Sequence, residues 1–234
     1  MSTYSIKTLS QTSPDVSYVD RRSETGHLTA VAILNLTIKV ISLGLALLPL
    51  LAPELPQFQD KWLAVRSFVY PLMVLAVPVF WWTRGRSSPY PHHLDTLVML
   101  PFFLDMSANA LNLYNTFEGT DKIAHWLISG IVVMAFGQVV SKLPISRLNA
   151  IGLLIGFGAT VHTLWEIGEY AMMKLGAFGL NLTYENTIHD FIFGLLGTAM
   201  ATVLTVTVLW PRPVSVDSLP MDLPLDFQHS CFDK

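Results

Sequence analysis

Six long apolar runs are the feature of this sequence that most restricts its fold. Each run is close to the roughly 20 residues that a helix needs to cross the hydrocarbon core of a bilayer. Inside hydrocarbon every backbone N–H and C=O group must find a partner within the protein, so such runs form helices. The sequence therefore predicts an all-α, polytopic bundle of six transmembrane helices. The runs cover about residues 28–52, 62–82, 95–115, 122–141, 149–174 and 187–210.

The composition supports this class of protein. Charged residues make up 13% of the 234 residues, which is about half the share in an ordinary soluble domain. Too few charges remain to cover a water-exposed surface. The net charge of −3 is small and indicates no nucleic-acid partner. The single cysteine, Cys231, excludes an intrachain disulfide and a thiolate metal cluster. The oligomeric state is left open.

The two ends of the chain differ from the apolar middle. Residues 1–27 are rich in Ser, Thr and charge and predict a flexible N-terminal tail. Residues 28–210 form the predicted transmembrane domain, and residues 211–234 form a polar C-terminal tail. Because the polar stretch precedes the first apolar run, no cleavable signal peptide is expected and the first run should remain as a helix.

Lysine and arginine near the helix ends predict the orientation, since these residues are retained on the cytoplasmic side. The other side holds fewer of them, with Arg66 expected to extend outward from just inside a helix. Both tails are therefore expected in the cytoplasm. The cytoplasmic set is Arg21, Arg22, Arg84, Arg86, Lys142, Arg147 and Arg212, and the other set is Lys61, Lys122 and Lys174.

Polar residues recur at helical spacing within four of the apolar runs. A charged side chain at mid-bilayer costs about 2.5–3.5 kcal/mol, so such residues suggest function. The third and fifth runs each carry three polar residues at i, i+4 and i+7, a spacing that places them on one face. These sets are Asp105, Asn109 and Asn112, then His162, Glu166 and Glu169, while the fourth run opens with Asp121 and His125 and the sixth with Asn186, His189 and Asp190.

The predicted topology places these four sets at a similar depth. Glu166 would lie roughly 10 Å below the outer end of its helix, at about 1.5 Å per residue. Buried polar groups in an apolar medium must satisfy one another. We therefore expect them to meet in one polar site in the extracytoplasmic half of the bundle. The alternative is a structural network that only locks the helices together.

The residue types predict the chemistry of this site. Imidazoles and carboxylates are ligands for zinc, manganese or iron, although the spacing matches neither HExxH nor the paired ExxH motifs. Without a metal, the clustered carboxylates would suit acid-base work or proton relay. The candidate metal ligands are His125, His162, Glu166, Glu169 and Asp190. The candidate catalytic residues are Asp121, His125, Glu166, Glu169 and Asp190, and the candidate substrate-binding residues are Asp105, Asn109, Asn112 and Asn186.

Lys39 is a separate polar residue, about eleven residues into the first apolar run and near mid-bilayer. We expect it to pair with a carboxylate such as Asp95 or Asp105. The alternative is that the first helix starts later, so that Lys39 lies nearer to the interface.

Three stretches carry a resemblance to a known family. The stretches "LNLYNTFEGTDKIAHWLISG", "WEIGEY" and "NTIHDFIFGLLG" resemble the YjdF-like family of uncharacterised integral membrane proteins, over about residues 98–205. The first Asp of the family's last motif is Asn186 here, which removes one anionic ligand. A weaker likeness is to VanZ-like proteins. The resemblance implies a six-helix fold in a bacterial-type inner membrane but no substrate. The matching positions are Tyr114, Asp121, Lys122, His125, Trp165, Glu166, Glu169, Thr187 and Asp190.

These observations predict a membrane-embedded site that binds or modifies a lipid or cell-envelope molecule, either through a divalent metal or through its acid-base groups alone. A small proton- or cation-coupled transporter and a structural accessory subunit are the alternatives. A transporter needs a polar path to the cytoplasmic side. The inner halves of the last three helices, residues 131–140, 151–159 and 198–209, offer little besides Gln138 and threonines. The sequence therefore favours a site that opens to one side.

Overall fold

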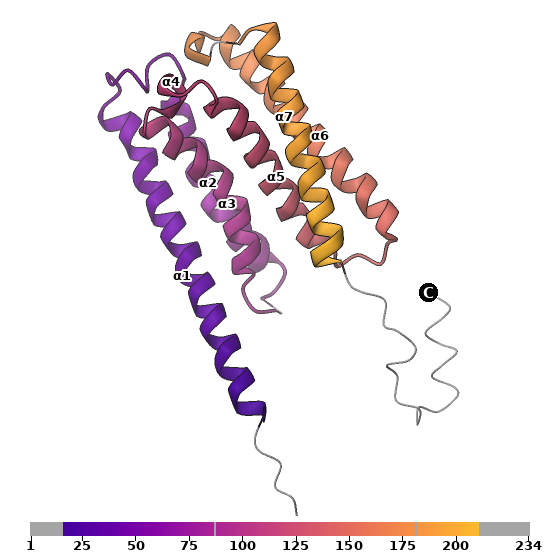
Figure 1. The fold of residues 1–234 in the computed structure, drawn as a ribbon. Coiled ribbons are helices and arrows are strands. Elements are labelled where there is room, and N and C mark those ends of the chain that lie inside the picture. The colour runs from indigo at the N-terminus through magenta and orange to yellow at the C-terminus, as the bar shows by residue number, and fades with distance from the viewer. Residues whose placement is uncertain (1–15, 87, 181, 211–234) are drawn as a thin grey trace, which may run out of the picture.

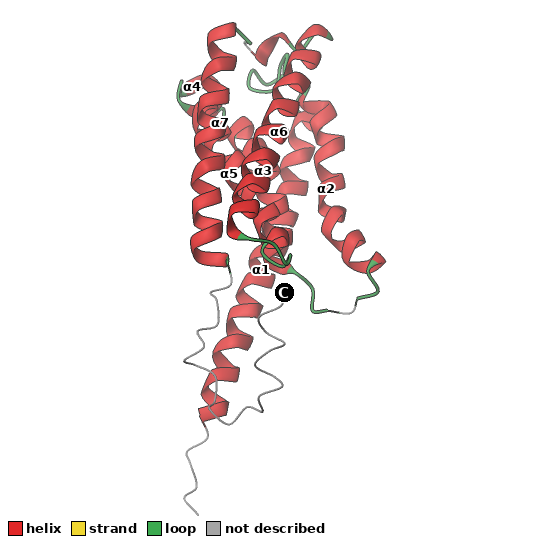
Figure 2. Cartoon of the chain, turned by 90° about the vertical axis from the view of Figure 1, so that its right-hand side faces the viewer, coloured by secondary structure: helices red, strands yellow, loops and turns green. Residues whose placement is uncertain are grey.

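The computed structural model describes residues 16–86, 88–180 and 182–210, which form helices and turns without a strand (Figure 2). Each predicted apolar run corresponds to one long helix. The helices are α1 (Val16–Leu51), α2 (Leu63–Thr83), α3 (His92–Ala110), the short α4 (Leu113–Thr116), α5 (Thr120–Val140), α6 (Arg147–Lys174), the 3-10 turn η1 (Phe178–Leu180), α7 (Tyr184–Leu204) and the π-helical turn η2 (Thr205–Leu209).

Five of these helical stretches are long and apolar enough to cross a membrane. They are Thr29–Leu51, Leu63–Thr83, Thr120–Val140, Arg147–Lys174 and Tyr184–Leu209. Large apolar side chains such as Ile33, Phe68 and Leu164 are exposed on their outer faces, as expected of helices that contact lipid. The remaining predicted span is the third apolar run. It corresponds to α3, which is 19 residues long but does not reach the same hydropathy. Its polar residues Asp95, Asp105 and Asn109 are buried against other helices.

Two predicted boundaries differ from the structure. Helix α1 begins at Val16, so residues 16–27, which the sequence placed in the tail, are helical. This stretch contains no proline, and polarity alone does not end a helix. Helix α3 ends at Ala110, before the predicted end near residue 115, because Asn112 adopts a left-handed conformation with φ 60°. Asparagine tolerates this conformation better than most residues. The predicted tail residues 1–15 and 211–234 lie outside the described residues.

The long helices run up and down between two ends of the bundle (Figure 1). Helix α3 packs against α1, α2 and α5, and α5 in turn packs against α6 and α7. One end, here called the terminal end, contains the start of α1, residues 84–86 and 88–91, the turn at residues 141–146, and the end of η2. The other, here called the opposite end, contains the connections at residues 52–62 and 111–119 and residues 175–180 and 182–183.

Glycines allow α5 and α7 to approach closely. A Cβ atom on Gly197 would lie 1.9 Å from the carbonyl oxygen of Trp126, so only glycine fits at this crossing. One turn earlier on α7, a Cβ atom on Gly194 would lie 2.5 Å from the His162 ring of α6. The close contacts bring the N-terminal turns of α5 and α7 beside the C-terminal half of α6, where the polar residues are.

The predicted partner of Lys39 is confirmed as Asp95, in a buried ion pair that joins α1 to α3. The Tyr90 hydroxyl also donates a hydrogen bond to Asp95, at 2.5 Å. Burial, together with this hydrogen bond, raises the pKa of Tyr90 well above its ordinary value, so the phenol stays protonated. Lys39 therefore lies inside the protein with a counter-charge and does not face lipid.

Candidate functional site

A cavity of about 320 Å³ lies between α2, α3, α5 and α6, toward the opposite end. Most of the polar residues that the sequence predicted to converge form its wall. Asn112, Glu166, His189 and Asp190 are the exceptions. Glu166 and Asp190 both contact His125, which does line the cavity. The predicted residues in the wall are Asp105, Asn109, Asp121, His125, His162, Glu169 and Asn186.

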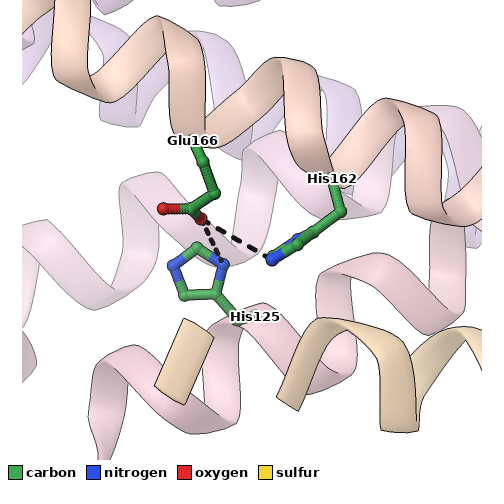
Figure 3. Close-up of side chains that lie close together, drawn as sticks. All are labelled: His125, His162 and Glu166. Carbon is green, nitrogen blue, oxygen red and sulfur yellow. Dashed lines mark ion pairs between the residues drawn. The ribbon is translucent and has the colours of Figure 1, made fainter. Parts of the chain in front are cut away.

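One group of potential metal ligands combines His125 of α5 with His162 and Glu166 of α6 (Figure 3). Glu166 Oε1 lies 3.5 Å from His125 Nδ1 and 3.6 Å from His162 Nε2. The two imidazole rings are nearly perpendicular, with centroids 5.1 Å apart. All three residues are buried. The i, i+4 spacing on α6 therefore presents His162 and Glu166 together to His125, as the sequence predicted.

A second group uses the other nitrogen of the same histidine. His125 Nε2 lies 3.6 Å from Asp121 Oδ1 and 3.7 Å from Asp190 Oδ1. Asn186 bridges the two acids, because its amide nitrogen donates to Asp121 Oδ2 at 3.1 Å and to Asp190 Oδ2 at 2.5 Å. We refer to Asp121, His125, His162, Glu166 and Asp190 together as the His/carboxylate cluster. Asn186 of α7 orients two acids of this cluster, Asp121 and Asp190.

Several atoms of the cluster are buried without a hydrogen-bond partner among the described residues. They are His162 Nε2, both carboxylate oxygens of Glu166, and Asp190 Oδ1. Burying polar atoms in this way is costly unless something bonds to them. Ser129 Oγ lies 3.3 Å from His162 Nδ1, which orients the ring and leaves Nε2 directed at Glu166. Glu166 Oε1 therefore meets His162 Nε2 on the Nδ1 side of His125, and Asp190 Oδ1 lies on its Nε2 side.

The separations fit a metal ion. Ligands at roughly 2.0–2.1 Å from a tetrahedral zinc lie about 3.3 Å from one another. On the Nδ1 side of His125, Glu166 Oε1 lies 3.5–3.6 Å from His125 Nδ1 and His162 Nε2, so small side-chain movements would place these three ligands around one ion. Asp121 and Asp190 lie on the Nε2 side of the ring and would belong to a separate position for an ion. Nitrogen and oxygen donors of this kind suit zinc, manganese or iron. Both the chemistry of the donor atoms and their spacing therefore fit a bound metal ion.

A second polar cluster lies on the α2 and α3 side of the cavity and centres on Arg66. Its guanidinium Nη1 donates to Asp105 Oδ2 at 3.0 Å, and its Nη2 lies 3.7 Å from Glu169 Oε1. Tyr70, Asn109 and Tyr114 also donate hydrogen bonds to the Asp105 carboxylate. We call these residues the Arg66 cluster: Arg66, Tyr70, Asp105, Asn109, Tyr114 and Glu169.

The Arg66 cluster corrects three expectations. Arg66 was expected to extend outward, but it is only 7% exposed, because Asp105 and Glu169 provide counter-charges inside the bundle. Glu169 was expected among the metal ligands, yet it pairs with Arg66 and belongs to neither ligand group. Asn112 was expected beside Asp105, but the early end of α3 places it in the turn before α4, outside the cavity wall.

Lys61 and Tyr114 line the cavity but were not predicted from the sequence as site residues. Lys61, in the connection between α1 and α2, is 7% exposed and lines the cavity. Burial, together with the positive charge of Arg66, lowers the pKa of Lys61 below its ordinary value. Tyr114, on α4, has a pKa raised well above its ordinary value, first by burial and then by Asp105. Lys61 could have been suspected only from its place near a predicted helix start.

Comparisons with protein-family models, with curated proteins and with solved structures find no match to this chain. The site is therefore interpreted from its own geometry. That geometry shows an all-helical protein of membrane type with a buried cluster of histidines and carboxylates beside a cavity.

Proposed function

We propose that the protein holds a divalent metal ion in the His/carboxylate cluster and uses this centre to bind or modify a lipid or cell-envelope molecule. The observation that carries the proposal is the set of buried, unpartnered ligand atoms of His162, Glu166 and Asp190 around His125. A metal ion on the Nδ1 side of His125 would satisfy His162 Nε2 and the Glu166 carboxylate, and one on the Nε2 side would satisfy Asp190 Oδ1. A bound ion would supply Lewis-acid polarisation of a carbonyl or phosphoryl oxygen, or an activated water.

We also propose the orientation. All six long helices, α3 included, would cross the membrane, with the terminal end in the cytoplasm and the site toward the extracytoplasmic side. Arg84, Arg86, Lys142 and Arg147 lie at the terminal end, in keeping with retention of positive charge in the cytoplasm. At the opposite end, Lys61 is buried in the cavity wall, which further reduces the exposed positive charge there. A bacterial-type inner membrane and membership of the YjdF-like family remain predictions from the resemblance.

The packing beneath the site favours this function over transport. Toward the terminal end, α5, α6 and α7 share an apolar core of Val133, Val140, Ala150, Leu154 and Ala201, with aromatic side chains packed against it. This layer contains no titratable group that could continue a proton or cation path. A purely structural role is also less favoured, because a network that served only to join helices would be expected to satisfy its own buried atoms.

The metal content of the purified protein tests this proposal. After equilibration with zinc, manganese and iron and removal of excess metal, we expect the full chain in detergent to retain about one ion. The double variant Glu166→Gln/Asp190→Asn should retain at least about tenfold less, because neutral amides are poor ligands. Elemental analysis by mass spectrometry gives both values.

The matched control is Glu185→Gln, which removes an exposed acid from the first turn of α7 outside the cluster. This variant should retain as much metal as the unaltered chain. A protein that retains no metal after equilibration, or a double variant that retains as much as the control, would reject the metal centre. Cells in which the double variant replaces the native chain should then be compared for changes in envelope lipids.

A further inference from the structure

We propose that the cavity binds an amphiphile with a phosphate headgroup, held between Lys61 and Arg66, whose alkyl chain lies along the apolar part of the wall. This inference rests on the proposed function and specifies the substrate class of the same site. It follows from the unused donors of Arg66 and Lys61 at one end of the cavity and from the apolar wall at the other.

Arg66 offers two free donors to the cavity. The residue is buried and lines the wall, and Nη1 is used by Asp105, but Nε and Nη2 have no hydrogen-bond partner among the described residues. The Glu169 carboxylate oxygen lies 3.7 Å from Nη2, beyond hydrogen-bond reach. A guanidinium fork with donors to spare matches the geometry of phosphate oxygens.

Lys61 adds a second cation to the same wall. Its ammonium donates one hydrogen bond, to Asn115 Oδ1 at 3.1 Å, and has two further protons to donate. Burial and the nearby Arg66 both disfavour its charge, which is why its pKa is lowered. A phosphate between the two cations would relieve both effects. Donors that remain unused in a buried wall are costly unless a ligand accepts from them.

The acids of the wall do not replace this anion. Asp105 already accepts from Arg66, Tyr70, Asn109 and Tyr114. Glu169 leaves Arg66 Nε unpartnered, and Asp121 is held by Asn186 and His125. On the α2 side, Lys61 and Arg66 lie with the carboxylates of Asp105 and Glu169, and the exposed Glu118 also lines the wall. A phosphate would therefore be held by the unused donors of Arg66 and Lys61, and not by a net positive charge of the wall.

The deeper wall is apolar. Val132 lies seven residues beyond His125 on α5, which is about 10 Å further from the opposite end. Phe102 of α3 and Ile128 and Val161 of the neighbouring helices complete this region. The cavity thus changes from polar at the opposite end, where Lys61 and Arg66 have unused donors, to apolar toward mid-membrane. Its volume of about 320 Å³ is at the lower end for small-molecule sites, enough for a headgroup and the start of a chain.

The test is lipid binding by the purified full chain, measured by native mass spectrometry in a non-ionic detergent. The protein is loaded with zinc and mixed with equal amounts of phosphatidic acid and phosphatidylcholine with identical chains. We expect phosphatidic acid to be preferred by at least about tenfold, equivalent to about 1.4 kcal/mol. Lys61→Gln should reduce this preference by about fivefold or more, whereas Lys174→Gln, an exposed lysine at the same end, should not change it.

Lys61 has few partners, so this variant should fold even if Arg66 variants do not. An equal preference in the Lys61→Gln and Lys174→Gln variants, or no preference in the unaltered chain, would overturn the inference. Excess inorganic phosphate should not displace the lipid. Displacement of the lipid by phosphate would instead identify free phosphate as the ligand. It would reject the proposal that an alkyl chain occupies the apolar part of the cavity.

The two proposals can fail separately. A chain that retains zinc but shows no Lys61-dependent preference for phosphatidic acid would overturn the lipid inference and leave the metal centre standing. A chain that retains no metal but prefers phosphatidic acid through Lys61 would overturn the metal centre and support anionic-lipid binding alone.

Discussion

Replacing Asp105 by leucine is expected to destabilise the folded protein by about 3–5 kcal/mol, because it leaves the buried guanidinium of Arg66 without its closest counter-charge. The hydroxyls of Tyr70 and Tyr114 would lose their acceptor as well. The free energy of unfolding in mixed micelles, measured by titration with a denaturing detergent, gives this value. Glu118→Leu, an exposed acid at the same end, is the control and should change it by less than about 0.5 kcal/mol.

A second variant separates the ion pair from the rest of the cluster. Arg66→Met/Asp105→Leu removes both charges, so it should be clearly more stable than Asp105→Leu alone. The free energy of unfolding of the double variant should still be lower than that of the unaltered chain, because the tyrosine hydroxyls remain without an acceptor. If the single and double variants are equally unstable, Arg66 does not depend on Asp105 and our description of the Arg66 cluster is wrong.

Metal binding is expected to increase the stability of the folded protein. An ion present at about 100 times its dissociation constant should stabilise the fold by about 2.7 kcal/mol. His125→Asn should abolish this stabilisation, because His125 belongs to both ligand groups. Thermal unfolding with and without zinc measures the effect. His189→Asn, next to Asp190 but in neither ligand group, should keep the full stabilisation, and loss of stabilisation in both variants would point to a non-specific cause.

The long helices could be predicted from the sequence because hydrocarbon allows few alternatives to a helix. Helices α2, α5, α6 and α7 lie within a few residues of the predicted runs. The start of α1 and the end of α3 could not be placed in the same way. Polar residues in a tail can still be helical, and the left-handed conformation of Asn112 has no signature in the apolar pattern.

The convergence of His125, Glu166 and Asp190 could also be predicted, because buried polar groups in a membrane must meet. Their partners within the bundle were harder to predict. Helical spacing gives the face on which a residue lies but not the helix that faces it. Glu169, three residues after Glu166, turns toward α2 and meets Arg66. Lys61 approaches through a connecting segment, for which periodicity carries no information.

In the proposed metal centre, the imidazoles of α5 and α6 bind one metal ion together with the Glu166 carboxylate of α6. X-ray absorption spectroscopy of the zinc-loaded full chain tests this arrangement most directly, since it reports the atoms bound to the metal. We predict two imidazole nitrogens and carboxylate oxygens at roughly 2.0–2.1 Å, with the imidazole signal lost in His125→Asn/His162→Asn. A spectrum without imidazole scattering, or one unchanged in that variant, would contradict the account.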